Sequence, residues 1–301
     1  MCRSSESLKD HLPYYGELFR NIYKAIPQYE LPYLKLSMSF AMLSTIIFVI
    51  LRIITTTVMI SVFGWPDHDP VTTTASSSIP SMIHATLLCP GLIAAFMAHK
   101  YNPSEHLSKA NPKWQDLCNS LLEFCTGYMI NDTFFLVYYS IPPGSSWPIM
   151  NKSNKGFLFH HLLTILYMSQ ARYYKAGHMS AMMCMLLGEL SNPLMNTFGM
   201  VKYASGLECF KDGPMLQQAK EIVPVLYSLV FLFLRTIIGP IVLIAMTGDL
   251  LFSKQGKENL PFHVRIMWSL IIWGVMSLSI PLISDCKDMI MAFARGQEQE
   301  L

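Results

Sequence analysis

Charged residues are scarce in this chain. Asp, Glu, Lys and Arg make up 14% of its 301 residues, against roughly 25% in an ordinary soluble domain. The basic residues are not clustered and the formal net charge is only +2, so the electrostatic footprint of a nucleic-acid-binding protein is missing. A soluble domain and a nucleic-acid partner are therefore both disfavoured.

Three other patterns are also missing. None of the seven cysteines forms a CxxC pair, and the spacing of Cys118 and Cys125 is weak support for zinc or a disulfide, so we expect no metal site. The first 35 residues lack the order of a cleaved signal, so the first apolar span is expected to serve as the anchor. No internal period repeats, which favours one domain.

Apolar residues are abundant: they make up 52% of the chain, and the mean hydropathy is positive. This composition predicts an all-α membrane protein, a bundle or barrel of about seven transmembrane helices, with six as the alternative if one short segment is re-entrant. A polar segment over 1–35 precedes the transmembrane domain over 36–290, and a short tail covers 291–301. The expected spans are about 36–63, 79–97, 117–141, two within 157–197, 222–246 and 264–284, with polar loops over 64–78 and 202–220.

Four spans carry an ionisable residue at membrane depth: Arg52, His84, Asp132 and Arg235. A charged group at the centre of a span costs roughly 2.5 to 3.5 kcal/mol on insertion scales, so each needs a partner or water. Structural pairing is the expected role of Arg52. Arg235 is expected either to bind a lipid phosphate or to pair with an internal acid.

The stretch 157–197 concentrates polar groups in apolar surroundings. His160 and His161 are adjacent, so their rings point in directions about 100° apart, and one of them is expected to face inward. Glu189 lies near the middle of the next apolar segment, and Asn192 can join the same face. Pro193 has no N–H for the Glu189 carbonyl, which leaves a free acceptor beside the carboxylate.

These residues resemble the TLC (TRAM-Lag-CLN) domain family, and within it the small TLC-domain-containing proteins. The resemblance spans roughly residues 36 to 296 and implies a six-helix core plus one helix. The resembling pieces are His84 in SMIHATLL, Gly127, Tyr128 and Asp132 in GYMIND, His160 with His161, Glu189, Ser191 and Pro193 in GELSNP, and Arg235 with Pro240.

The resemblance also extends to the ceramide synthases, which have a similar His-His pair followed by two aspartates. In this chain the corresponding positions look like Glu189 and Asn192. We therefore favour a protein that binds or adjusts lipids in an intramembrane polar cavity and acts in membrane lipid homeostasis. The alternatives are a lipid acyltransferase that uses the His pair and acyl-CoA as substrate, with no other cofactor, and an early secretory cargo receptor.

The expected site residues follow from membrane depth and from the resemblance together. The candidate catalytic residues are His160, His161, Glu189 and Asp132, and the candidate ligand-binding residues are His84, Ser191, Asn192, Arg235 and Arg52. In the acyltransferase alternative, a neutral imidazole is the base or nucleophile, and Glu189 or Asp132 orients it. The expected partners are membrane lipids or acyl chains.

The distribution of basic residues predicts the orientation. The first extramembrane segment has five Lys and Arg residues, and the loop after the first span has none, which favours a cytosolic N-terminus. The Asn151-Lys152-Ser153 sequon would then lie in a lumen. The expected location is the endoplasmic reticulum or another endomembrane.

Overall fold

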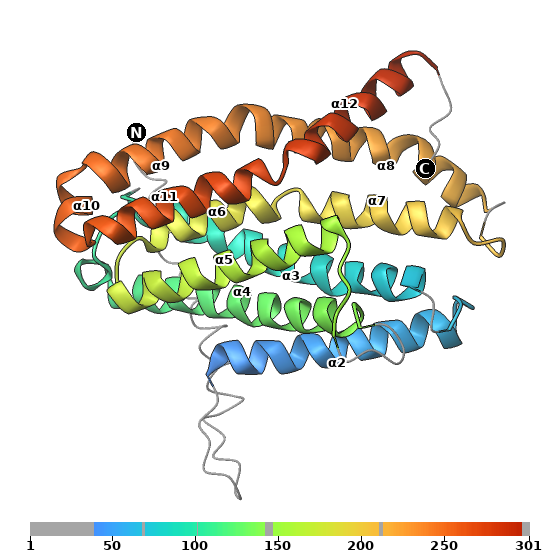
Figure 1. Ribbon diagram of the computed structural model, residues 1–301, viewed down its shortest axis with the longest axis horizontal. Helices are drawn as coiled ribbons and strands as arrows, with labels where there is room; N and C mark the ends of the chain where they lie inside the picture. Colours follow the sequence, from blue (N-terminus) through green and yellow to red (C-terminus); the bar gives the residue numbers. More distant parts are fainter. Residues whose placement is uncertain (1–38, 68–69, 101, 142–146, 211–212, 297–301) are drawn as a thin grey trace, which may run out of the picture. The chain divides into compact units, whose positions relative to one another are not determined.

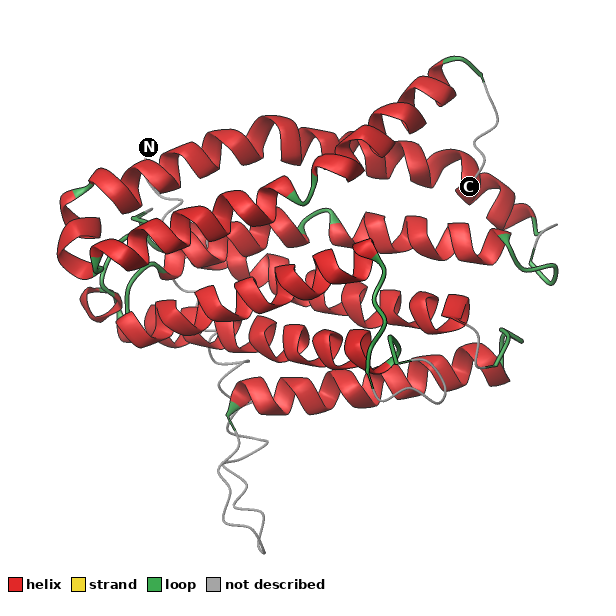
Figure 2. Cartoon of the chain, viewed as in Figure 1, coloured by secondary structure: helices red, strands yellow, loops and turns green. Residues whose placement is uncertain are grey.

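The computed structural model of the protein describes residues 39–67, 70–100, 102–141, 147–210 and 213–296. Within those ranges the chain is helical and forms no sheet (Figures 1 and 2). The all-α prediction is therefore confirmed. The expected N-terminal segment over 1–35 lies outside the described residues, as does the end of the 291–301 tail.

The helices follow the apolar runs in chain order. They are α2 (Phe40–Ser61), α3 (Pro70–Ala98), the short η1 (Leu107–Lys109), α4 (Pro112–Tyr138), α5 (Lys152–Tyr174), α6 (His178–Glu189), α7 (Asn192–Ser205), α8 (Pro214–Leu232), the π-helix η2 (Phe233–Ile238), α9 (Gly239–Phe252), α10 (Lys254–Asn259), α11 (Phe262–Ser277) and α12 (Ile280–Ala294).

The chain divides into two compact units. Unit 1 comprises residues up to Phe48, Leu88–Leu186 and Ile244–Val275, and unit 2 comprises Val49–Leu87, Leu187–Leu243 and the chain from Met276 onward. Several helices contribute to both units. Each unit is described below by itself.

In unit 1, α4 packs along α5 and also against the first half of α2. Gly127 makes the second contact possible, because a Cβ atom there would lie 2.4 Å from the Ala41 carbonyl oxygen. Trp268 of α11 is fully buried, and its Nε1 donates to Gln170 Oε1 at 2.7 Å. The turn between α5 and α6 fits beneath this indole because Gly177 has no side chain and adopts a φ of +75°.

In unit 2, α8 packs against both α7 and α12. Tyr227, Phe231 and Cys286 form a buried cluster at this contact, and the ring of Phe198 stacks on Tyr227 with the centroids 5.4 Å apart. The π-helix η2 ends just before Pro240, which has no N–H for the carbonyl four residues earlier. A local change in the bonding pattern is therefore expected there.

Several expected boundaries were wrong. The loop predicted over 64–78 is helical from Pro70, and there the hydroxyls of Ser76 and Ser77 donate to carbonyls within α3. The loop predicted over 202–220 is shorter, since α7 ends at Ser205 and α8 begins at Pro214. The last expected span ended near residue 284, whereas α12 continues to Ala294.

Among the described residues, four helical segments are long and apolar enough to cross a membrane: Phe40–Ser61, Val71–Ala98, Pro214–Phe252 and Phe262–Ala294. The expected count was seven. The helices α4 and α5 contain several charged residues, and α6 is only 12 residues long, so these segments do not stand out by length and hydropathy. The count of seven stays a prediction.

Candidate intramembrane sites

The first site lies in unit 1, between α4 and α5. His161 Nε2 lies 3.5 Å from Asp132 Oδ2, and the side chains are 6% and 25% exposed. Two further contacts align the same helices: Arg172 Nη1 lies 3.3 Å from Glu123 Oε1, and the Thr126 hydroxyl lies 4.0 Å from the Met168 sulfur. The packing of α4 on α5 therefore brings a buried imidazole to a carboxylate.

The two adjacent histidines have different environments. His161 is buried, as is Met168 on the same face of α5, whereas His160 is half-buried. Their ring centroids are 5.6 Å apart, with the planes tilted by 55°. The expectation that one ring faces inward is confirmed, and that ring is His161.

The second site lies in unit 2, where α3 meets the end of α6. His84 Nδ1 lies 3.3 Å from Glu189 Oε2, and the side chains are 0% and 6% exposed. Asn192 Nδ2 donates to the same Glu189 oxygen at 2.8 Å. An imidazole and an amide thus both contact the carboxylate that the sequence places at membrane depth, and Asn192 shares its polar face as predicted.

Arg235 of η2 also belongs to this region of unit 2. Its Nη2 donates to the Gly188 carbonyl oxygen at 3.3 Å, and its guanidinium carbon lies 5.4 Å from the centre of the Phe231 ring. A cation at this position complements the partial negative charge at the carboxyl end of α6. The bond is to Gly188, whereas the predicted free backbone acceptor was the carbonyl of Glu189, so that prediction stays a prediction.

Two other predicted residues are buried in unit 2. Ser191 is 1% exposed and directly precedes α7, and its hydroxyl has no hydrogen-bond partner among the described residues. Arg52 is 6% exposed within α2. The structure thus joins His161 to Asp132, and it joins His84 to Glu189 and Asn192, so each candidate orienting acid has its own imidazole.

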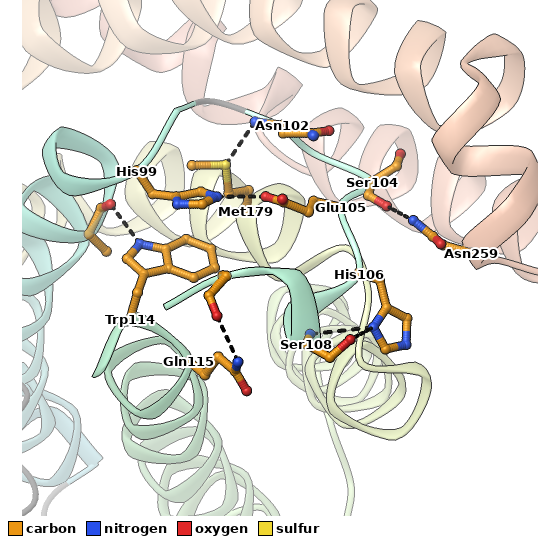
Figure 3. A network of polar contacts seen from close by, with 12 residues as sticks. His99, Asn102, Ser104, Glu105, His106, Ser108, Trp114, Gln115, Met179 and Asn259 are labelled. Carbon is orange, nitrogen blue, oxygen red and sulfur yellow. Dashed lines mark hydrogen bonds and ion pairs between the residues drawn. The ribbon is translucent and has the colours of Figure 1, made fainter. Parts of the chain in front are cut away.

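A further polar network, which the sequence does not reveal, holds the α3–α4 connection in unit 1 (Figure 3). His99 Nε2 lies 2.6 Å from Glu105 Oε2, and the Asn259 amide donates to the Ser104 carbonyl at 2.8 Å. The Ser104 hydroxyl also bonds to Asp249. The two contacts of Ser104 attach this connection to α9 and α10, and Asn102 N–H approaches the Met179 sulfur of α6. Among the described residues, no group of three or more metal-ligating side chains lies together.

Sequence reasoning also missed Asn131, which precedes Asp132. Asn131 is fully buried in α4. An amide within an apolar span was the signal that could have identified it, since buried polar groups in spans are costly.

Paired acids and imidazoles inside a bundle of apolar helices are features of an integral, multi-pass membrane protein. The TLC (TRAM-Lag-CLN) domain model matches residues 74–285, more than half of the chain, so the protein belongs to the TLC-domain family. No curated protein and no solved structure is a match to it. The matched segment includes both pairs and excludes α2.

Proposed function

We propose that the protein binds membrane lipids at its buried imidazole–carboxylate pairs and acts in membrane lipid homeostasis, in the endoplasmic reticulum or another endomembrane. The TLC family is broadly linked to lipid metabolism and sensing. The observation that carries the proposal is that two imidazole–carboxylate pairs join helices, His161 with Asp132 in unit 1 and His84 with Glu189 in unit 2.

Two physical arguments support the proposal: the free-energy cost of placing ionisable groups in a membrane, and the hydrogen-bonding groups that the pairs offer. Ionisable groups within spans are rare, and they commonly mark a ligand or ion pathway. A simple hydrogen bond between helices contributes only about 0.6 kcal/mol on average, which makes an acid an expensive way to hold two helices together. Each pair offers both donors and acceptors to the polar part of a lipid.

Lipid retention tests this proposal. The protein is purified in a mild detergent, and its bound lipids are identified by mass spectrometry. We expect Asp132→Asn and Glu189→Gln to lose most of a lipid that the unmodified protein retains. Glu123→Gln is the matched control, because Glu123 is also a partly exposed carboxylate of α4 that contacts a base of α5. An unmodified protein without lipid, or variants that retain it fully, would count against the proposal.

A second candidate is a lipid acyltransferase, and the contact between His161 and Asp132 favours it. A neutral imidazole can remove the proton of an acceptor or attack a thioester, and a nearby carboxylate orients the ring and stabilises its charged form. Acyl-CoA would be the donor. Incubation with acyl-CoA and lysolipid or sphingoid acceptors should give a product that His161→Ala abolishes, and equal product from both proteins would remove this candidate.

The orientation belongs to the same proposal: seven spans with a cytosolic N-terminus and a lumenal α4–α5 loop. Asn151 lies at the start of α5, where its side chain accepts a hydrogen bond from the Asn154 N–H at 2.7 Å. A glycosylation shift that Asn151→Gln removes would support this orientation. A cysteine at position 152 that reacts only with a cytosolic reagent would overturn it.

A role as cargo receptor in the early secretory pathway stays a third proposal. Crosslinking followed by recovery of secretory cargo would test it, and the absence of enriched cargo would remove it.

A further inference from the structure

In unit 1, α2 meets α4, and α2 precedes the segment that the family model matches. The two helices approach most closely at Gly127, where a Cβ atom would lie 2.6 Å from Ser44 Cβ. The Thr45 hydroxyl lies 2.9 Å from the Ala41 carbonyl oxygen and 3.1 Å from that of Gly127. This hydroxyl is therefore satisfied by the backbone of both helices.

Two other polar side chains of this contact are not satisfied. Both amide atoms of Asn131 and the hydroxyl of Ser44 have no hydrogen-bond partner among the described residues. Their exposed fractions are 0% and 1%. Most buried polar groups in proteins are hydrogen-bonded, so two such groups in one helix contact require a physical explanation.

Asn131 and Ser44 belong to the same region of the contact. Asn131 follows Gly127 by one helical turn and shares its face of α4, while Ser44 is the residue of α2 opposite Gly127. Apolar rings flank them: the Phe48 ring lies 5.2 Å from that of Tyr128 and 5.5 Å from that of Phe124, measured between centroids. The polar atoms therefore lie in an otherwise apolar environment.

The chemistry of these atoms selects a ligand class. Asn131 supplies two donors and one acceptor, and Ser44 supplies one donor and an acceptor. A hydroxyl group, which both donates and accepts, complements this set. An ionic group does not, because residues 40–48 and 124–131 contain no charged side chain to balance it. We propose that Asn131 and Ser44 bind one uncharged hydroxyl group, carried by a lipid or by water, which bridges α2 to the TLC domain.

This site uses different residues from the imidazole–carboxylate pairs, so it goes beyond the proposed lipid-binding function and can fail without it. The test rests on the sign of a stability change. Leucine has the shape of asparagine without its polar atoms. If nothing binds, Asn131→Leu removes an unsatisfied amide and raises the thermal unfolding midpoint; if a hydroxyl binds, the variant lowers it by roughly 2 to 4 °C.

A double-mutant cycle with Ser44→Ala gives a second readout. The bridging hydroxyl couples the two residues, so the double variant should be hardly less stable than Asn131→Leu alone. Thr126→Val is the control, because the Thr126 hydroxyl donates to the Leu122 carbonyl and contacts the Met168 sulfur of α5 rather than α2, and its effect should add to that of Asn131→Leu. A higher midpoint in Asn131→Leu, or in Ser44→Ala if the first variant does not fold, would overturn the proposal.

The source of the hydroxyl is resolved on the unmodified protein after extensive delipidation. If a lipid supplies it, the midpoint falls on delipidation and returns with oleyl alcohol but not with octadecene, and Asn131→Leu shows no such recovery. If water supplies it, the unfolding midpoint of the unmodified protein stays above that of Asn131→Leu after delipidation, and neither oleyl alcohol nor octadecene changes this difference. Either result supports the site, whereas recovery of both proteins by oleyl alcohol would contradict it.

Discussion

The two imidazole–carboxylate pairs have the same chemistry in different surroundings. In unit 2 the Glu189 side chain is 6% exposed, and it contacts both His84 and Asn192. In unit 1 the Asp132 side chain is 25% exposed, and its distance to His161 is slightly longer. Asp132 has an open side at which another polar group can replace a lost partner, whereas the enclosed Glu189 carboxylate has none. We therefore expect the pair in unit 2 to matter more for stability and the pair in unit 1 to be the more accessible to a ligand.

The largest expected effect comes from His84→Ala. The substitution leaves the Glu189 carboxylate buried without its imidazole, and loss of one partner from a buried pair typically costs about 3 kcal/mol or more. Thermal or SDS-induced unfolding in detergent measures this loss. Glu189→Gln, which leaves an amide beside Asn192, should cost less. If His84→Ala were as stable as the unmodified protein, the pair in unit 2 would not be the one that matters more for stability.

A second substitution tests whether close packing of α4 maintains the pair in unit 1. Gly127→Ala places a methyl group 2.4 Å from the Ala41 carbonyl oxygen, and such overpacking typically costs about 1 to 3 kcal/mol. The matched control is Gly188→Ala beside Glu189, where no atom lies within 4 Å of the added carbon. We expect a lower unfolding midpoint for the first variant alone. A similar loss in both would mean that contact geometry does not explain the result.

Asp132→Asn should have a smaller effect on stability than His84→Ala, about 1 kcal/mol, because the asparagine amide keeps a hydrogen-bonding group beside His161 and leaves no buried charge without a partner. Its effect on lipid retention should nevertheless be large if the accessible pair binds the ligand. Unfolding midpoints and bound lipid are measured on the same preparation. A stability loss as large as that of His84→Ala would contradict the comparison.

The smallest expected effect is that of Asn192→Ala, which removes one amide donor from Glu189 and leaves His84 in place. Interhelical polar contacts in membrane proteins average about 0.6 kcal/mol, and a loss near that value is expected in the unfolding assay. Asn154→Ala, at an exposed end of α5, serves as a reference for a neutral change. If Asn192→Ala were as damaging as His84→Ala, the amide would be the main partner of Glu189.

Much of the candidate site could be predicted because polar groups in apolar spans are conspicuous. Asp132, His84 and Glu189 were identified on that basis, and the α-helical period correctly placed Asn192 beside Glu189. Helix ends were less accurate. The hydroxyl-rich start of α3 was interpreted as a loop, since Ser and Thr favour turns in isolation, but in the helix they bond to carbonyls one turn earlier.

The sequence by itself determined the helical class and the presence of apolar segments long enough to cross a membrane, because these depend on local composition and on the length of apolar runs. Only the tertiary structure decided the pairing. That Asp132 contacts His161 while Glu189 contacts His84 follows from which helix packs on which, and that Arg235 bonds to Gly188 depends on where η2 meets the end of α6. Contacts between residues far apart in the chain depend on close approach of helix surfaces, such as that at Gly127, which no local pattern specifies.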